Sequence, residues 1–266
     1  MKKLIVIKFG GSVITDKKKE TPTPNMKNIN SLAKQLSQVS LGNRYKFIIV
    51  HGAGSYAHPL AKKYQLSKGM STEEQKFGFA LMNRQMLELN LLIVKSLQDY
   101  NLSAVGLAPH SFVTQSEGKL KKLDHKIVKY LLKGNQIPVL YGDGVLDDKW
   151  GCSILSGDTI VSHLAKKLKA KKVIFLSDVD GIYDSDPKKN PEAKLIKEIN
   201  SENLEKVLEG ITSNNPHDVT GEMKGKILDI KINLQGVPVQ VLSGLKMGNL
   251  DKAVVQGLGG TRLQFG

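Results

Sequence analysis

Short apolar runs alternate with longer stretches of helical spacing along most of the chain. Residues 4–9, 46–50, 103–107, 137–141, 173–176 and 238–242 are short apolar runs, which are typical of strands buried on both faces of a sheet. Apolar positions recur at helical spacing over 26–39, 77–97, 124–133, 158–168 and 224–235. Residues 73–78 and 183–192 are the two stretches that we expect to depart from this order. Repeated strand–helix units predict an α/β fold, with a largely parallel central sheet and helices on both faces.

The length and composition suit one domain. The chain has 266 residues, of which 40% are hydrophobic, and these are enough for a sizeable core. We place a soft boundary near residues 166–171, between an N-terminal lobe (about 1–165) and a C-terminal lobe (about 166–266). No apolar run approaches the ~18 residues of a membrane span, and the run at 4–7 is too short for a signal peptide. A lone cysteine, Cys152, rules out an internal disulfide and suits the cytoplasm.

The formal net charge of +14 raises the question of an anionic partner. The lysines form scattered clusters rather than one block, and aromatic residues make up only 6% of the chain. Base stacking on aromatic side chains is therefore not indicated. A regulatory or nucleic-acid-binding protein stays an alternative that rests on the charge alone, and we expect neither nucleic acid nor a membrane as partner.

Two glycine-rich loops follow the first two strong strands. The sequence KFGGS occupies 8–12, and HGAGSYAH occupies 51–58. Small residues let successive backbone N–H groups approach phosphate oxygens, and His58 adds a further donor for an anion. The spacing fits neither a Walker A loop nor a dinucleotide fingerprint. Each loop alone is also what an ordinary strand-to-helix turn looks like.

Three more polar segments lie next to predicted strands or helices. SGD at 156–158 opens a helix, DVDGIY at 178–183 follows a strand, and TGEMKGK at 220–226 leads into a helix with two lysines. Ligands of parallel α/β sheets bind beyond the carboxyl ends of the strands. The sequence has no Ser-His-Asp order and no cluster of metal ligands. Glycine loops combined with lysines favour phosphoryl transfer, in which positioning and charge stabilisation supply most of the catalysis.

These motifs, taken together and in this order, resemble those of the amino-acid kinase family. The resemblance extends over almost the whole chain and implies the three-layer αβα sandwich of that family. Within it, HGAGSYAHP at 51–59 and DVTGEMKGK at 218–226 are most similar to members that phosphorylate isopentenyl phosphate to the diphosphate with ATP. His58 is the discriminating position. Fosfomycin, UMP and an amino-acid carboxylate are the alternative acceptors within the same fold.

The resemblance implies roles for residues that bind the nucleotide. We assign nucleotide binding to the C-terminal lobe, together with the loop that follows the first strand. The residues expected to act on the transferring phosphoryl group or to orient its ligands are Lys8, Lys17, Asp158 and Lys226. Those expected to bind ATP are Gly10, Gly11, Ser12, Asp178, Tyr183, Asp186 and Lys224. Mg²⁺ would bridge the ATP phosphates, and no metal site made of protein side chains is expected.

The acceptor side is assigned to the N-terminal lobe in the same way. The residues expected around the acceptor phosphate are Ala53, Gly54, Ala57, His58 and Gly157. The expected apolar walls for an isoprenoid tail are Phe79, Met82, Met86 and Ile154, whereas Leu89 and Ile93 are expected to be core. The resemblance also implies a homodimer and a place in isoprenoid biosynthesis by an alternative mevalonate route.

Three positions depart from the family pattern. Ala57 replaces a glycine, Glu222 adds a negative charge near the expected ATP phosphates, and Gly144 replaces a branched apolar residue. The small residue at 144 is expected to deepen the tail pocket and admit longer chains.

Overall fold

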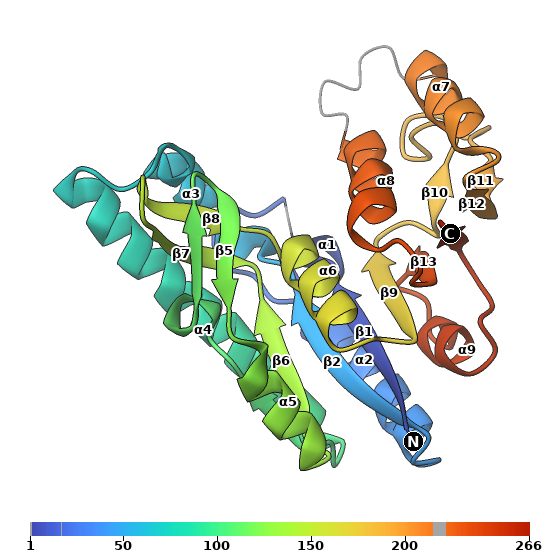
Figure 1. The fold of residues 1–266 in the computed structure, drawn as a ribbon, viewed down its shortest axis with the longest axis horizontal. Coiled ribbons are helices and arrows are strands. Elements are labelled where there is room, and N and C mark those ends of the chain that lie inside the picture. The colour runs from blue at the N-terminus through green and yellow to red at the C-terminus, as the bar shows by residue number, and fades with distance from the viewer. Residues whose placement is uncertain (1, 17, 215–221) are drawn as a thin grey trace.

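The computed structural model describes residues 2–16, 18–214 and 222–266, although the side chains of 212–214 and 222 are not described. The largest sheet has eight strands in the order β12 (Glu198–Asn200), β14 (Thr261–Gln264), β13 (Val239–Ser243), β9 (Lys172–Ser177), β1 (Lys3–Phe9), β2 (Tyr45–His51), β6 (Ile137–Tyr141) and β3 (Ala104–Gly106). All neighbours in it are parallel except β13 and β14. The predicted, largely parallel sheet is therefore confirmed (Figure 1).

Helices cover both faces of this sheet. They are α1 (Gly11–Ile14), α2 (Met26–Ser40), α3 (His58–Lys63), α4 (Glu73–Asp99), α5 (His125–Lys133), α6 (Gly157–Lys167), α7 (Leu204–Asn214), α8 (Glu222–Asn233) and α9 (Asn249–Val255). Helices α2, α4 and α9 pack on one face, and α5 to α8 pack on the other, so that the sheet lies between two hydrophobic cores. This is the three-layer αβα arrangement expected from the sequence.

The alternation of side chains along β1 decides where Lys8 points. Ile5, Ile7 and Phe9 belong to the core beneath α2 and α4, and Val6 belongs to the core beneath α6. Successive strand residues point to opposite faces, so Lys8 emerges on the side of Val6. The strand thereby directs a cation toward the first turn of α6.

A four-stranded sheet beside α4 was not predicted from the sequence. Its order is β5 (Lys119–Leu123), β4 (Val113–Ser116), β7 (Asp143–Asp147) and β8 (Gly151–Leu155). The turn between β4 and β5 has positive φ at Glu117 and Gly118, as a two-residue hairpin turn requires. That Glu-Gly pair between short alternating runs was the signal available in the sequence. A two-stranded sheet of β10 (Ile182–Tyr183) and β11 (Leu195–Ile196) was also missed.

Helix α4 begins earlier than predicted. Residues 73–78 were expected to depart from the regular order, but they form its first turn and a half, so that expectation is wrong. The Thr72 hydroxyl accepts from the Gln75 N–H, and the Gln75 side chain in turn accepts from the Thr72 N–H. This capping box satisfies two N–H groups that would otherwise lack partners. Among the described residues, no helix combines the length and apolar character needed to cross a membrane.

Candidate active site

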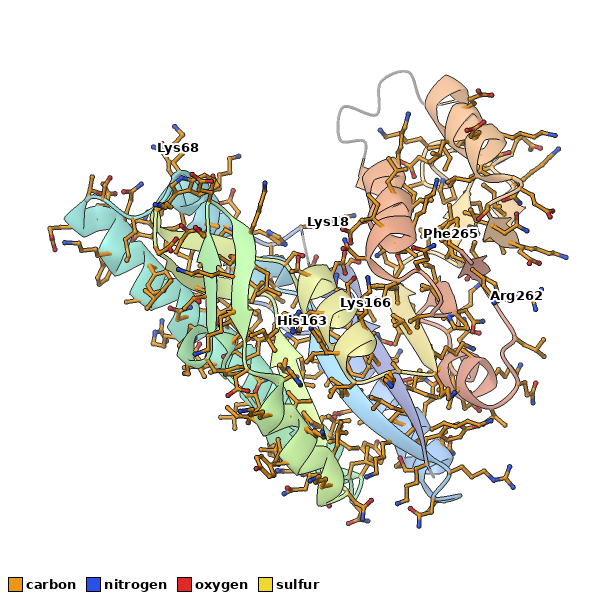
Figure 2. All side chains as sticks on the ribbon, viewed as in Figure 1. Lys18, Lys68, His163, Lys166, Arg262 and Phe265 are labelled. Atoms are coloured by element: carbon orange, nitrogen blue, oxygen red, sulfur yellow. The ribbon has the colours of Figure 1, made fainter. Side chains whose placement is uncertain are left out.

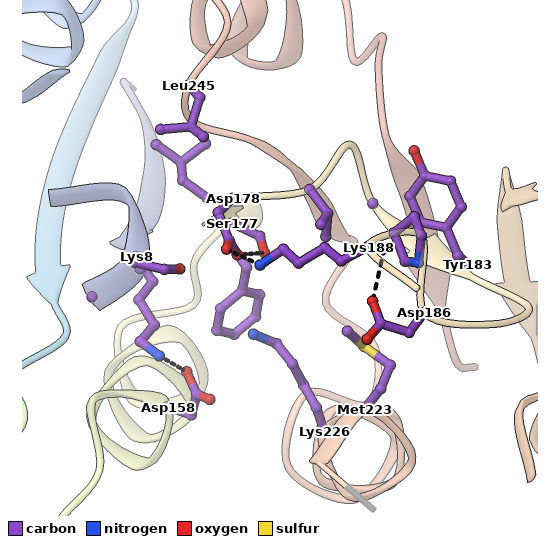
Figure 3. A pocket seen from close by; sticks show the side chains of 18 of the residues that line it. Lys8, Asp158, Ser177, Asp178, Tyr183, Asp186, Lys188, Met223, Lys226 and Leu245 are labelled. Atoms are coloured by element: carbon purple, nitrogen blue, oxygen red, sulfur yellow. Dashed lines mark hydrogen bonds and ion pairs between the residues drawn. The ribbon is translucent and has the colours of Figure 1, made fainter. Parts of the chain in front are cut away.

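A cleft of about 1120 Å³ opens at the carboxyl ends of β1 and β9. It is bounded by the glycine turn after β1, the start of α6, the loops after β9 and β10, and helix α8 (Figure 3). Its described lining includes five lysines and five aspartates, namely Lys8, Lys18, Lys188, Lys189, Lys226, Asp16, Asp158, Asp178, Asp186 and Asp229. The cleft therefore offers many cations for an anionic ligand while keeping its own charge balanced.

Two lysines and one aspartate meet at the base of the cleft. The Lys8 Nζ lies 2.6 Å from the Asp158 Oδ1, and Lys226 extends from α8 with its Nζ 4.6 Å from the centroid of the Phe175 ring. Burial raises the pKa of the Asp158 carboxyl, but the charges of Lys8 and Lys226 and the Lys8 hydrogen bond outweigh it, so its pKa lies below the usual value. Asp158 thus stays ionised and holds Lys8 in place.

Four loop ends converge beside this cluster. A Cβ on Gly11 would lie 2.7 Å from the Gly54 nitrogen, and a Cβ on Gly157 would lie 3.1 Å from the Lys8 Cε. A Cβ on Gly142 would lie 2.9 Å from the Gly157 nitrogen. The glycine loops after β1, β2 and β6 and the start of α6 therefore meet closely, and at Gly11 and Gly142 the approach of backbone to backbone leaves no room for a side chain. Phosphates bound to adjacent loops would lie next to each other.

A buried histidine fixes the second of these loops. His51 ends β2, stacks on Tyr141 with ring centroids 5.1 Å apart, and lies 3.0 Å from the Gly52 carbonyl through Nδ1. That carbonyl can only accept, so Nδ1 carries the proton and Nε2 accepts from the Asn90 amide at 3.2 Å. Burial lowers the pKa of His51 to about 4, so the ring is neutral at pH 7. The sequence motif contained His51, but its positioning role follows only from these contacts.

The expected nucleoside residues line the far side of the cleft. Asp178, Tyr183 and Asp186 all contribute to its lining, as do Gly10, Gly11 and Ser12 at the opposite wall. Lys188, which the sequence analysis did not select, forms an ion pair with Asp178 (Figure 3). Burial raises the pKa of the Asp178 carboxyl, but the Lys188 hydrogen bond and charge lower it by more. The Lys-Lys pair directly after Asp186-Pro187 was the available signal.

The apolar residues expected around a tail lie between α4 and β7. Gly144 and Ile154 are paired across β7 and β8 and therefore face the same side, and a Cβ on Gly144 would lie 3.2 Å from the Phe79 ring. The same Cβ would lie 2.4 Å from the Met82 Cε. The space left by the small residue is thus filled by Met82, which corrects the expectation that Gly144 deepens an open pocket.

Other members of the predicted tail and acceptor set have different surroundings. Met86, like Leu89 and Ile93, has no exposed surface, so Met86 is core here rather than an open wall. His58 is exposed at the first residue of α3, and Ala57 beside it is buried. Ala53 and Gly54 lie in the loop that contacts Gly11. None of these residues is among the described lining of the cleft.

Two of the lysines predicted to bind ATP are not found among the described lining residues of the cleft. Lys224 is exposed on α8, two residues from Lys226, and is absent from the described lining. Lys17 lies outside the described residues, as do Thr220 and Gly221 of the TGEMKGK motif, and the side chain of Glu222 is not described. The lysines that do join Lys8 and Lys226 at the cleft are Lys18, Lys188 and Lys189.

This arrangement is suited to moving a phosphoryl group between two bound phosphates. Backbone N–H groups and lysines stabilise charge on transferring oxygens, and a fixed carboxylate orients the lysines. Within the part of the chain that the structure describes, no three His, Cys, Asp or Glu residues are grouped as a metal site. A divalent cation would have to be held largely by the phosphates of the ligand itself.

Comparison with known proteins agrees with this class. The amino acid kinase family matches residues 3–243, and the chain belongs to that family. A protein of Methanothermobacter thermautotrophicus named isopentenyl phosphate kinase is 33% identical over 98% of both chains. A protein of the same name from Methanocaldococcus jannaschii is 35% identical over 98% of this chain and 99% of its own. A solved structure described as isopentenyl phosphate kinase superimposes with a TM-score of 0.84 at 31% identity, covering 98% of this chain and 99% of its own.

Cationic side chains also lie outside the cleft. Figure 2 places Lys68, Lys166 and Arg262 on widely separated parts of the molecule.

Proposed function

We propose that this protein transfers the γ-phosphoryl group of ATP to isopentenyl phosphate, giving isopentenyl diphosphate and ADP. Relatives that carry this name align over nearly the full length of both chains. The observation that carries the proposal is the meeting of the glycine loops after β1 and β2 beside Lys8. Two phosphate-binding loops in contact are what a phosphate-to-phosphate transfer needs.

The chain's own residues supply binding and charge stabilisation. An oxygen of the acceptor monoester attacks the γ-phosphorus, the bond from that phosphorus to the β,γ-bridging oxygen breaks, and ADP leaves with the electron pair. Lys8 and Lys226 would stabilise the three oxygens of the moving group, and Asp158 would keep Lys8 oriented. The acceptor phosphate is already ionised at neutral pH, so no general base is required.

The ATP site would occupy the cleft. Gly11 and Ser12 would donate backbone N–H groups to the β- and γ-phosphates, and Asp178 would accept from the ribose hydroxyls. Gly10 lines the cleft, but its N–H already donates to the Leu176 carbonyl at 3.0 Å, which corrects the donor role expected for it. Lys188 would then exchange its ion pair with Asp178 for a phosphate oxygen. Tyr183 and Asp186 would lie along the nucleoside, with Lys17 and Lys224 near the phosphates. Mg²⁺, held largely by the phosphates of ATP, would supply additional charge neutralisation.

The acceptor phosphate would bind beside the second glycine loop. The proposed ligands are the N–H groups of Ala53, Gly54 and Gly157 and the imidazole of His58. The Ala57 N–H already donates to the Gly54 carbonyl, which corrects the donor role expected for it. We assign acceptor binding to the lobe at about 1–165 and nucleotide binding to the lobe at about 166–266, with Lys8 and the first glycine turn completing the cleft from the other lobe. A cytoplasmic homodimer working in an alternative mevalonate route is part of the same proposal.

An ADP-release assay tests this function directly. Purified protein receives Mg-ATP with isopentenyl phosphate, fosfomycin, UMP or acetylglutamate in parallel. Turnover with isopentenyl phosphate alone is expected, and it should be lost in His58→Ala but kept in Lys62→Ala, which removes an exposed cation from the same helix α3. Preference for another acceptor would keep the kinase class but reject the role given to His58.

A further inference from the structure

A buried carboxylate that the proposed transfer does not use connects three elements. The side chain of Asp143 has no exposed surface. Its Oδ1 accepts from the Asn83 amide at 2.7 Å and from the Gly144 N–H at 2.9 Å, and its Oδ2 lies 2.7 Å from the His110 Nδ1. Asn83 belongs to α4, Asp143 begins β7, and His110 lies in the short turn Pro109–Ser111. The Asn83 amide also donates to the Gly144 carbonyl at 3.0 Å.

These contacts join the two sides of the proposed tail site. Asn83 directly follows Met82 on α4, and Asp143 directly precedes Gly144 on β7. A Cβ on Gly144 would lie 2.4 Å from the Met82 Cε, so the two sides already touch. Any loss of the polar contacts one residue away would change the spacing of these apolar groups. Asn83 and Asp143 therefore link α4 directly to β7 beside these apolar groups, and His110 links the turn at 109–111 to the same carboxylate.

His110 is the member of this network that can be changed with the least disturbance of the fold. About 24% of its side chain is exposed, whereas Asp143 is buried. A carboxylate can only accept, so the Nδ1 of His110 donates to Oδ2. Burial raises the pKa of the Asp143 carboxyl, and the His110 hydrogen bond opposes that effect. Removal of the imidazole would leave a buried oxygen without this donor, and the surrounding backbone would adjust.

We propose that His110 is a positioning residue for the acceptor, acting through Asp143 and Asn83 to hold α4 and β7 at the spacing that an apolar tail requires. The inference rests on the proposed function, since it assigns the tail to this part of the molecule. His110 is not among the described lining residues of the cleft, so its effect should be confined to the acceptor.

Three variants separate positioning from general stability. His110→Ala removes the donor, and His110→Asn restores an amide N–H at the place of Nδ1. Ser96→Ala is the matched control, because it removes a buried 2.8 Å hydrogen bond to Asn30 from the same helix, thirteen residues beyond Asn83. The Michaelis constants for isopentenyl phosphate and ATP, together with kcat, are measured for each variant and for the wild type.

The KM values for the two substrates are expected to respond differently. His110→Ala should raise the KM for isopentenyl phosphate about tenfold, while the KM for ATP stays within about twofold. His110→Asn should recover most of the loss, and Ser96→Ala should leave both constants near those of the wild type. A merely structural role would change both constants together, or would not distinguish Ala from Asn.

The other possible outcomes reject either the positioning role of His110 or the proposed function itself. Equal changes in both constants, or the same behaviour in His110→Ala and Ser96→Ala, would overturn the positioning role and leave the proposed function standing. A wild-type protein that phosphorylates another acceptor and ignores isopentenyl phosphate would reject the proposed function, and the inference that depends on it would be rejected too.

Discussion

The two sides of the proposed active site are built in opposite ways. The nucleotide side is an open cleft whose described lining carries lysines and aspartates in equal number, several of them already paired. On the tail side, Met82 fills the room beside Gly144 and a buried carboxylate ties α4 to β7, while Ile154 keeps 40% of its surface exposed. A highly charged ligand is thus offered a cleft lined by charges, whereas an apolar one meets packed side chains. The contrast predicts that ATP-side substitutions act through charge and tail-side substitutions through spacing.

The largest effect is expected at the base of the cleft. Lys8→Met removes a cation held 2.6 Å from Asp158 while keeping the length of the side chain. Loss of one donor to a transferring group lowers kcat by roughly 10²–10³-fold. Single-turnover kinetics measure this loss, and Lys3→Met, at the exposed start of the same strand, is the control. A kcat that changes less than tenfold would mean that Lys8 is not near the moving phosphoryl group.

The second effect concerns stability as a function of pH. His51 has its pKa lowered from 6.5 to about 4, so the unfolded chain takes up a proton before the folded protein does. Stability should therefore fall as the pH drops below 6.5, and about 2 kcal/mol should be lost between pH 7.5 and about pH 5. Urea unfolding at the two pH values measures it. His51→Gln should flatten this dependence, and an unchanged slope would exclude His51 as its source.

The third effect concerns Asp178 and distinguishes binding of the ATP ribose from binding of the acceptor. Asp178→Asn weakens an acceptor for ribose hydroxyls and removes the partner of Lys188, so the KM for ATP should rise about tenfold while the KM for the acceptor is kept. Steady-state kinetics with each substrate varied are sufficient. Asp148→Asn is the matched control, because Asp148 pairs with Lys121 and is absent from the described cleft lining. Identical behaviour of the two variants would contradict the assignment.

The smallest effect is expected at Gly144. A valine there would push the end of Met82 into the region proposed for the tail, since a Cβ alone would come within 2.4 Å of it. Activity on geranyl phosphate should fall a few-fold more than activity on isopentenyl phosphate, because a longer tail needs more of that space. Competition between the two acceptors in one assay gives the ratio directly. Equal losses would show that Met82 does not face the tail.

The sequence was sufficient to predict the main strands and the place of the cleft. Continuous apolar runs such as 4–9 and 137–141 required burial on both faces, and a parallel sheet is the structure that provides it. The resemblance of the glycine motifs selected Lys8, Asp158, Asp178 and Lys226, and the structure brings all four to one cleft. Site roles beyond this placement stay predictions.

Other features depended on contacts that no local pattern contains. Lys188 meets Asp178 only because the loop after β10 folds back over β9, and His110 meets Asp143 across 33 residues of chain. The strands of the hairpins β4–β5 and β7–β8 have only four or five residues each, so they carry little of the signal that marks a long buried strand.

The amino-acid sequence by itself determined which segments are buried and which strand ends carry glycines and charge, because hydrophobic periodicity and turn chemistry act over a few residues. Only the tertiary structure decided that Met82 occupies the space beside Gly144 and that a buried carboxylate joins α4 to β7. Both outcomes depend on close packing between segments about 60 residues apart. Such packing is set by the shapes of facing side chains, which the order of residues along one segment does not reveal.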